Sequence, residues 1–128
     1  MTYIPHNHHR HSAYANQKSQ WSITVPEEVS CYKNAANMMW SSNGTFWGLH
    51  LNAVVPLPLG VAPLPAGDRL HIAKFVGDPA GNWHGYPVAP WLKPNDRPDE
   101  LVLKKWLAAG YISSATLAKI HRSKKCAL

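Results

Sequence analysis

Residues 69–88 read RLHIAKFVGDPAGNWHGYPV, and this stretch predicts the centre of the fold. Its two arms, 69–76 and 83–88, are rich in β-branched and aromatic residues, whereas the six residues between them are dense in turn formers. We therefore expect the two arms to pair as an antiparallel hairpin, with Val76 opposite Trp83.

On the N-terminal side of the hairpin, residues 45–55 alternate apolar and mixed positions with a period of two, which predicts another strand. Residues 26–41 carry an apolar stripe at helical spacing, and Pro26 with the acidic residues after it suits a first helical turn. Asn43 and Gly44 are expected to stop this helix. The stripe predicts a helix that packs on the sheet as scaffold.

On the C-terminal side, residues 97–124 predict a basic helical hairpin. Pro98 suits the start of the first helix, Gly110 suits the turn, and Ser113 or Ser114 can cap the second helix. The arrangement resembles the helix-turn-helix motif of DNA-binding proteins in outline, although Tyr111 lengthens the turn by one residue.

Together these patterns predict an α+β fold: an N-terminal helix, a small antiparallel β-sheet of about three strands and a C-terminal helical hairpin. The first 20 residues have no apolar period and are mostly polar, which predicts a flexible, His-rich, basic tail. At 128 residues and 45% hydrophobic composition, the remainder, 21–128, is expected to form one domain.

Basic residues outnumber acidic ones by 13 to 7, and residues 91–128 alone hold eight bases against three acids. This imbalance predicts nucleic-acid binding. RNA or single strands are favoured over a duplex, because the start of the second helix lacks an obvious base-reading set. The side chains expected to bind nucleic acid are Lys104, Lys105, Ser113, Ser114, Lys119, Arg122, Lys124, Lys125, Trp83 and Tyr86.

No cofactor, metal or membrane partner is expected. The sequence has no apolar run long enough to span a bilayer, no signal peptide and no glycine-rich phosphate loop, so a cytoplasmic location is the default. Cys31 and Cys126 lack the spacing of a zinc site. The histidines of segment 6–11 are expected to bind transition metals only adventitiously.

Three histidines, His50, His71 and His84, fall on separate predicted strands. Imidazole can act as acid and as base near neutral pH, so one alternative is a metal-independent ribonuclease. In it His84 and His71 form the acid/base pair, His50 substitutes for either, and Lys74 stabilises charge on the phosphoryl oxygens. This hypothesis requires the three imidazoles to converge on one cleft. It leaves open whether the protein is an enzyme.

A protein-interaction role is the other alternative. An adaptor or inhibitor could dock the basic surface on an acidic protein partner and place the Pro-Leu-Pro segments 56–58 and 63–65 in an aromatic groove. The same segments also suit a rigid loop that covers one end of the core. The sequence thus favours nucleic-acid binding and keeps both alternatives open.

Overall fold

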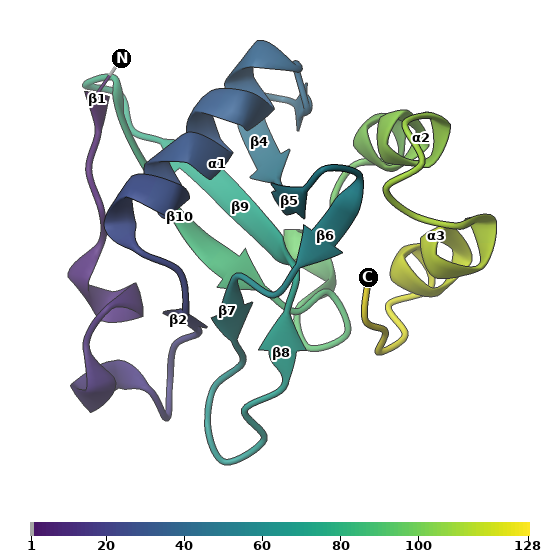
Figure 1. Cartoon of the computed structure of the whole chain (residues 1–128). Coiled ribbons are helices and arrows are strands. Elements are labelled where there is room, and N and C mark those ends of the chain that lie inside the picture. Colours follow the sequence, from purple (N-terminus) through teal and green to yellow (C-terminus); the bar gives the residue numbers. More distant parts are fainter. Residues whose placement is uncertain (1) are drawn as a thin grey trace.

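The computed structural model describes residues 2–128, which form three short helices and ten strands in three sheets (Figure 1). The largest sheet has the order β1-β10-β9-β4-β3, and it is mixed because β1 joins β10 in parallel. Its strands are β1 (Thr2–Tyr3), β3 (Ser41–Ser42), β4 (Thr45–Gly48), β9 (Ile72–Gly77) and β10 (Asn82–Val88).

Two smaller sheets and the helices complete the chain. Strands β2 (Gln20–Trp21), β7 (Gly60–Val61) and β8 (Arg69–Leu70) form one sheet, and β5 (His50–Asn52) pairs with β6 (Val55–Leu57). The helices are α1 (Val25–Asn37), α2 (Glu100–Ala108) and α3 (Ser114–His121), with 3-10 turns η1 (Asn7–His9), η2 (Ser12–Tyr14) and η3 (Pro94–Asp96). None of the helices within residues 2–128 is long and apolar enough to cross a membrane.

The chain mixes helices and strands, but the expected architecture of N-terminal helix, three-stranded antiparallel sheet and C-terminal helical hairpin is wrong. Two strands precede α1, and strand content is larger than expected. The predicted strands 45–55 and 69–76 each break, at Leu49 and His71, and their halves join different sheets. Strands of two or three residues are too short to show a period of two, so the sequence pattern misses them.

The first long helix begins as its composition indicates and ends early, at Asn37. The Thr24 side chain accepts a hydrogen bond from the Glu27 N–H, and the Glu27 carboxylate accepts one from the Thr24 N–H. Asn43 and Gly44, expected to stop the helix, instead form the turn between β3 and β4 with φ of 50° and 76°. Asn-Gly is a preferred pair for tight hairpin turns, because both positions need positive φ.

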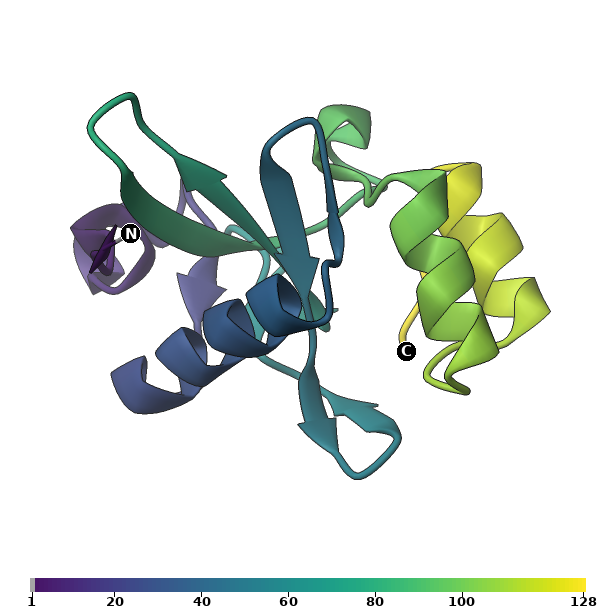
Figure 2. The ribbon, with the colours of Figure 1, turned by 90° about the horizontal axis from the view of Figure 1, so that it is seen from above.

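The C-terminal helices are shorter than the hairpin predicted over 97–124. Residues 94–96 form η3, and α2 begins after it. Asp99 caps α2, since its side chain accepts a hydrogen bond from the Leu101 N–H. Figure 2 shows α2 and α3 on the side of the molecule away from the N-terminal segment. Trp106 of α2 packs edge-on against Trp40, with ring centroids 5.7 Å apart, and this contact attaches the helices to the main core.

Two glycines leave room for the Phe75 ring, and one of them, Gly48, also lets α1 approach the sheet closely. A Cβ at Gly48 would lie 2.9 Å from the Phe75 ring and 3.2 Å from the Cys31 carbonyl oxygen of α1. A Cβ at Gly85 would lie 2.2 Å from the same ring. Phe75 is fully buried in the space these glycines leave, so the core is set by backbone contact as much as by side chains.

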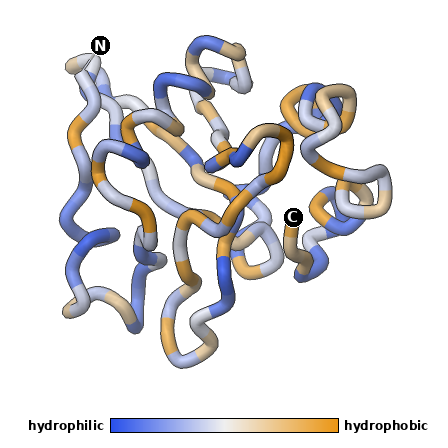
Figure 3. Tube along the Cα trace, in the orientation of Figure 1, coloured by the Kyte–Doolittle hydropathy of each residue, from blue (hydrophilic) through white to orange (hydrophobic). Residues whose placement is uncertain are grey.

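Residues 2–20, for which the sequence predicts a flexible tail, lie in this structure beside β10 and the start of α1 (Figure 1). Figure 3 shows that the segment is mostly hydrophilic, and it packs on the main core through the Tyr3 ring, 5.0 Å from the Tyr32 ring and 5.9 Å from the Phe75 ring. A buried charge also holds the segment, because the Glu28 side chain of α1 is 0% exposed and its partners come from this segment.

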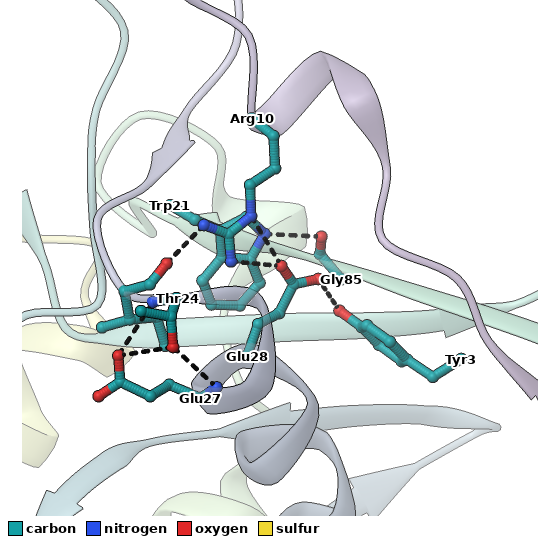
Figure 4. A network of polar contacts seen from close by, with 8 residues as sticks. Tyr3, Arg10, Trp21, Thr24, Glu27, Glu28 and Gly85 are labelled. Atoms are coloured by element: carbon teal, nitrogen blue, oxygen red, sulfur yellow. Dashed lines mark hydrogen bonds and ion pairs between the residues drawn. The ribbon is translucent and has the colours of Figure 1, made fainter.

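Figure 4 shows how the Glu28 carboxylate is satisfied. Arg10 donates from Nε and Nη2 to Oε1, at 3.1 and 2.7 Å, and the Tyr3 hydroxyl donates to Oε2. Arg10 also donates to the Ile23 carbonyl, and its guanidinium carbon lies 5.8 Å from the centroid of the Trp21 ring. Every oxygen of a costly buried charge therefore has a donor.

Arg10→Ala removes the charge partner of Glu28 and leaves the carboxylate buried. We expect the free energy of unfolding to fall by about 3–5 kcal/mol, the range measured when one partner of a buried ion pair is removed. Urea denaturation of the purified chain measures it. Lys104→Ala is the matched control, since it breaks the exposed Lys104–Glu100 pair and should change stability by less than about 0.5 kcal/mol.

That residues 1–20 form a flexible tail stays a prediction. The buried Arg10–Glu28 pair predicts the opposite, that the segment is held in place. If residues 1–20 move freely, trypsin cuts rapidly after Arg10 and Lys18 and leaves the rest of the chain intact. If the pair holds the segment, cleavage at Lys18 is slow in the native chain and fast in Arg10→Ala. Equal cleavage rates in the two proteins would contradict the anchoring argument.

Candidate functional site

A cleft of about 350 Å³ opens between the N-terminal segment and the C-terminal half of β10. Its volume lies in the range of small-ligand pockets. Four histidines, two lysines and a tyrosine give it its chemical character: His6, His8, His9, His84, Lys18, Lys93 and Tyr86.

The register of the β9–β10 hairpin decides which side chains face this cleft. Trp83 pairs with Gly77, one residue from the expected register, because Gly77 extends β9 and shortens the turn. Tyr86 then pairs with Lys74, and His84 lies two residues away on the same face of β10. His84 and Tyr86 therefore face away from the buried ring of Phe75 and toward the N-terminal segment.

His9 is held in one tautomer. Its Nδ1 lies 2.8 Å from the Ser19 carbonyl oxygen, which can only accept, so Nδ1 carries the hydrogen and Nε2 is an acceptor. The ring stacks on Tyr86, with centroids 5.0 Å apart and planes at 16°. Burial lowers the pKa of His9 to about 4, against the opposing effect of the Ser19 bond, so this imidazole is neutral at pH 7.

His6 has the opposite tautomer. Its Nδ1 accepts a hydrogen bond from the His8 N–H at 3.3 Å, so the neutral ring carries its hydrogen on Nε2 and can donate there. Burial, followed by the charges of His8, His84 and Lys18, lowers its pKa. The His6 ring lies 4.5 Å from that of His8 and 5.2 Å from that of His84, centroid to centroid. The cleft thus holds a ring donor and a ring acceptor close to two lysines.

The Asp96 carboxylate and the Tyr86 side chain line the cleft, and Lys74, which is not part of the lining, pairs with Asp96. Lys74 Nζ lies 3.1 Å from Asp96 Oδ1 and also donates to the Asn95 carbonyl at 3.2 Å. The Tyr86 hydroxyl donates to the same Asp96 oxygen at 3.3 Å, and burial raises the pKa of Tyr86. Lys74, predicted to stabilise phosphoryl charge, is therefore neutralised by Asp96.

The predicted acid/base histidines lie in different places. His84 lines the cleft, whereas His71 lines a separate pocket beside Trp91, and His50 on β5 has its Nε2 3.4 Å from Glu27 Oε2. The cleft contains neither His71 nor His50. The structure instead brings His84 together with the histidines of residues 6–9, for which the sequence pattern predicts a tail.

The predicted nucleic-acid residues divide into two groups. Trp83 and Tyr86 lie on β10, where Trp83 packs 5.2 Å from the Phe46 ring. The others lie on or next to α2 and α3, where Ser113 caps α3 and Ser114 begins it.

Several of the helix cations already have partners. Lys104 Nζ lies 3.5 Å from Glu100, Lys105 donates to the Met39 carbonyl at 3.0 Å, and Lys125 pairs with Asp68 at 2.6 Å. Among the predicted cations that the structure describes, those not paired with an acidic residue or a carbonyl lie at the end of α3: Lys119, Arg122 and Lys124.

Within residues 2–128, no group of three or more His, Cys, Asp and Glu side chains is arranged to hold a metal ion. Both cysteines are free thiols: Cys31 is buried and Cys126 is half-buried, and burial raises the pKa of each.

The low pKa of His9 links stability to pH. An unfolded histidine titrates near 6.5 and folded His9 near 4, so between these values the unfolded chain binds more protons. The contribution of His9 is complete above pH 6.5 and is lost as the pH falls toward 4. From pH 7 to 5 we expect the wild type to lose about 1 kcal/mol more stability than His9→Asn, after solvent screening. Urea denaturation at the two pH values tests this, and equal losses would contradict it.

No protein-family model matches the chain, and neither a curated protein nor a solved structure is similar to it. The chemistry of the cleft and the charge of the chain are accordingly the observations from which function is inferred.

Proposed function

We propose that the protein binds nucleic acid, RNA or single strands in preference to a duplex, and that the cleft holds one nucleotide unit. The observation that carries this proposal is the set of groups in the cleft. Lys18 and Lys93 supply charge for a phosphate, and the imidazoles supply rings and hydrogen bonds suited to a base or a sugar.

The acceptor in the cleft adds a requirement that a carboxylate cannot meet. A carboxylate offers no hydrogen to a neutral imidazole nitrogen, so His9 Nε2 does not contribute to recognition of acidic side chains. A nucleotide carries phosphate oxygens that accept and hydroxyl or amino groups that donate, which match both kinds of group in the cleft.

The ribonuclease alternative with His84 and His71 as its pair gains no support from this geometry, because His71 lies outside the cleft. The basic end of α3 has a different role in the proposal. Helix α3 lies on the far side of the molecule from the N-terminal segment (Figure 2), and Lys119, Arg122 and Lys124 on or just after it add sequence-independent attraction for a polyanion.

The proposal is tested by the salt dependence of binding to a fluorescent 12-nucleotide single strand. The wild type should bind at low salt, and its affinity should fall as salt rises. Lys18→Ala/Lys93→Ala should weaken binding and reduce the slope of log K against log salt by roughly 0.7 for each phosphate that the lysines no longer neutralise. Fluorescence anisotropy over a salt series measures both quantities.

Lys33→Ala is the control for loss of a lysine elsewhere, and it matches in charge the single variants Lys18→Ala and Lys93→Ala, since Lys33 is an exposed residue of α1 outside the cleft. It should leave the slope unchanged. Triple replacement of Lys119, Arg122 and Lys124 by alanine measures how much of the binding affinity comes from the α3 surface and how much from the cleft. Absence of binding at low salt, or affinity independent of salt, overturns the proposed function and turns attention to an acidic protein partner.

A further inference from the structure

We propose that His9 Nε2 accepts a hydrogen bond from a ribose 2′-hydroxyl, so that the cleft selects RNA over DNA of the same sequence. The proposal rests on the nucleic-acid function above and names the group that the cleft would recognise. It would make His9 a specificity-determining residue, with Lys18 holding the neighbouring phosphate.

The His9 ring cannot turn over without breaking a hydrogen bond and a ring stack. Its Nδ1–H is bonded to the Ser19 carbonyl, and Ser19 is itself tied to β10 because its hydroxyl donates to the Pro87 carbonyl at 2.6 Å. The ring face is stacked on Tyr86. Within residues 2–128, Nε2 makes no hydrogen bond, so a fixed acceptor remains available to a ligand.

The acceptor has a cation beside it. Lys18 precedes Ser19 in the chain, lines the same cleft, and its charge acts on both His6 and His9. A phosphate bound at Lys18 would therefore share the cleft with the His9 ring. In RNA the 2′-hydroxyl is on the carbon adjacent to the one that bears the 3′-phosphate, whereas the donor groups of a base are farther away. Among the donor groups of a nucleotide whose 3′-phosphate is bound at Lys18, the 2′-hydroxyl is thus the one closest to that phosphate, and we assign it to His9 Nε2.

A neutral acceptor discriminates where a cation cannot. DNA carries only C–H at the 2′ position, so bound DNA would leave His9 Nε2 unpaired in a partly buried site. The lysines bind the phosphates of RNA and DNA alike. The difference between the two polymers should therefore depend on His9 and not on salt.

The experiment compares fluorescent 12-nucleotide strands of uridine, deoxyuridine and 2′-O-methyluridine, which share one base and differ at the 2′ position. By anisotropy, the native chain should bind oligouridine roughly tenfold more tightly than oligodeoxyuridine, the value of one hydrogen bond. The 2′-O-methyl strand lacks the donor and should bind no better than the deoxy strand. These three measurements need no variant.

His9→Asn then tests the residue. Asparagine keeps an N–H in reach of the Ser19 carbonyl but has no acceptor at the position of Nε2, so oligouridine binding should weaken to the level of oligodeoxyuridine. His11→Asn is the matched control: His11 is exposed, lies outside the cleft, and its ring acceptor for the Ala13 N–H is replaced by the amide oxygen. Circular dichroism and the thermal midpoint show whether each variant is folded. If His9→Asn is not folded, His9→Phe, which keeps a ring on Tyr86, takes its place.

The outcomes separate the two proposals. Salt-dependent binding with equal affinity for uridine and deoxyuridine strands overturns the role of His9 and leaves nucleic-acid binding standing. Retention of the RNA preference in folded His9→Asn and His9→Phe overturns it as well. Absence of binding to all three strands overturns the proposed function itself.

Discussion

A carboxylate without solvent contact is the constraint on which the rest of this structure depends. Placing the Glu28 charge inside the protein costs several kcal/mol unless donors surround it, and those donors are Arg10 and Tyr3. Both come from the first residues of the chain, so α1 holds the N-terminal segment at two points. His6, His8 and His9 lie between these points, and one wall of the cleft is therefore a consequence of the buried charge.

The same segment protects the largest sheet. β10 is the long strand next to the edge, and β1 pairs only with its first residues, Asn82 and Trp83. Beyond them, the Trp21 indole N–H donates to the Gly85 carbonyl at 3.3 Å and the Ser19 hydroxyl donates to the Pro87 carbonyl. These side chains occupy carbonyls that an open edge would offer to another strand. Edge protection and the cleft wall are thus built from one stretch of chain.

Part of this arrangement could be predicted from sequence. The arms around residues 77–82 are rich in β-branched and aromatic residues and form β9 and β10, apart from Arg69 and Leu70, which join another sheet as β8, and the start of α1 follows its capping residues. Asn43-Gly44 misled because the same pair ends helices and closes hairpins, and only the strands on either side distinguish the two. Glu28 was interpreted as a charge that favours a helix start, since no local pattern shows that a carboxylate is buried.

The site was harder to predict than the fold, for a related reason. Strand spacing identified His84 and Tyr86, but residues 6–9 carry no apolar period, and composition alone predicts a tail for them. Their position depends on a bond from Arg10 to a residue 18 positions later, which is a long-range pairing of charges and not a pattern in the sequence. The only arginine of an acid-free segment, followed by a carboxylate in the first turn of a helix, is the one signal that could have indicated it.

The number of histidines in the cleft suggests a cationic site for anions, but burial makes at least His9 a neutral hydrogen-bonding group. A cluster of cationic imidazoles would bind any anion, whereas burial keeps His9 neutral at pH 7 and fixes it as an acceptor through Ser19. In the proposed function, charge recognition is then left to Lys18 and Lys93, which line the same cleft. Because cations would set affinity for phosphate and a neutral acceptor would reject ligands that cannot donate, the proposal assigns affinity and selectivity in this cleft to different side chains.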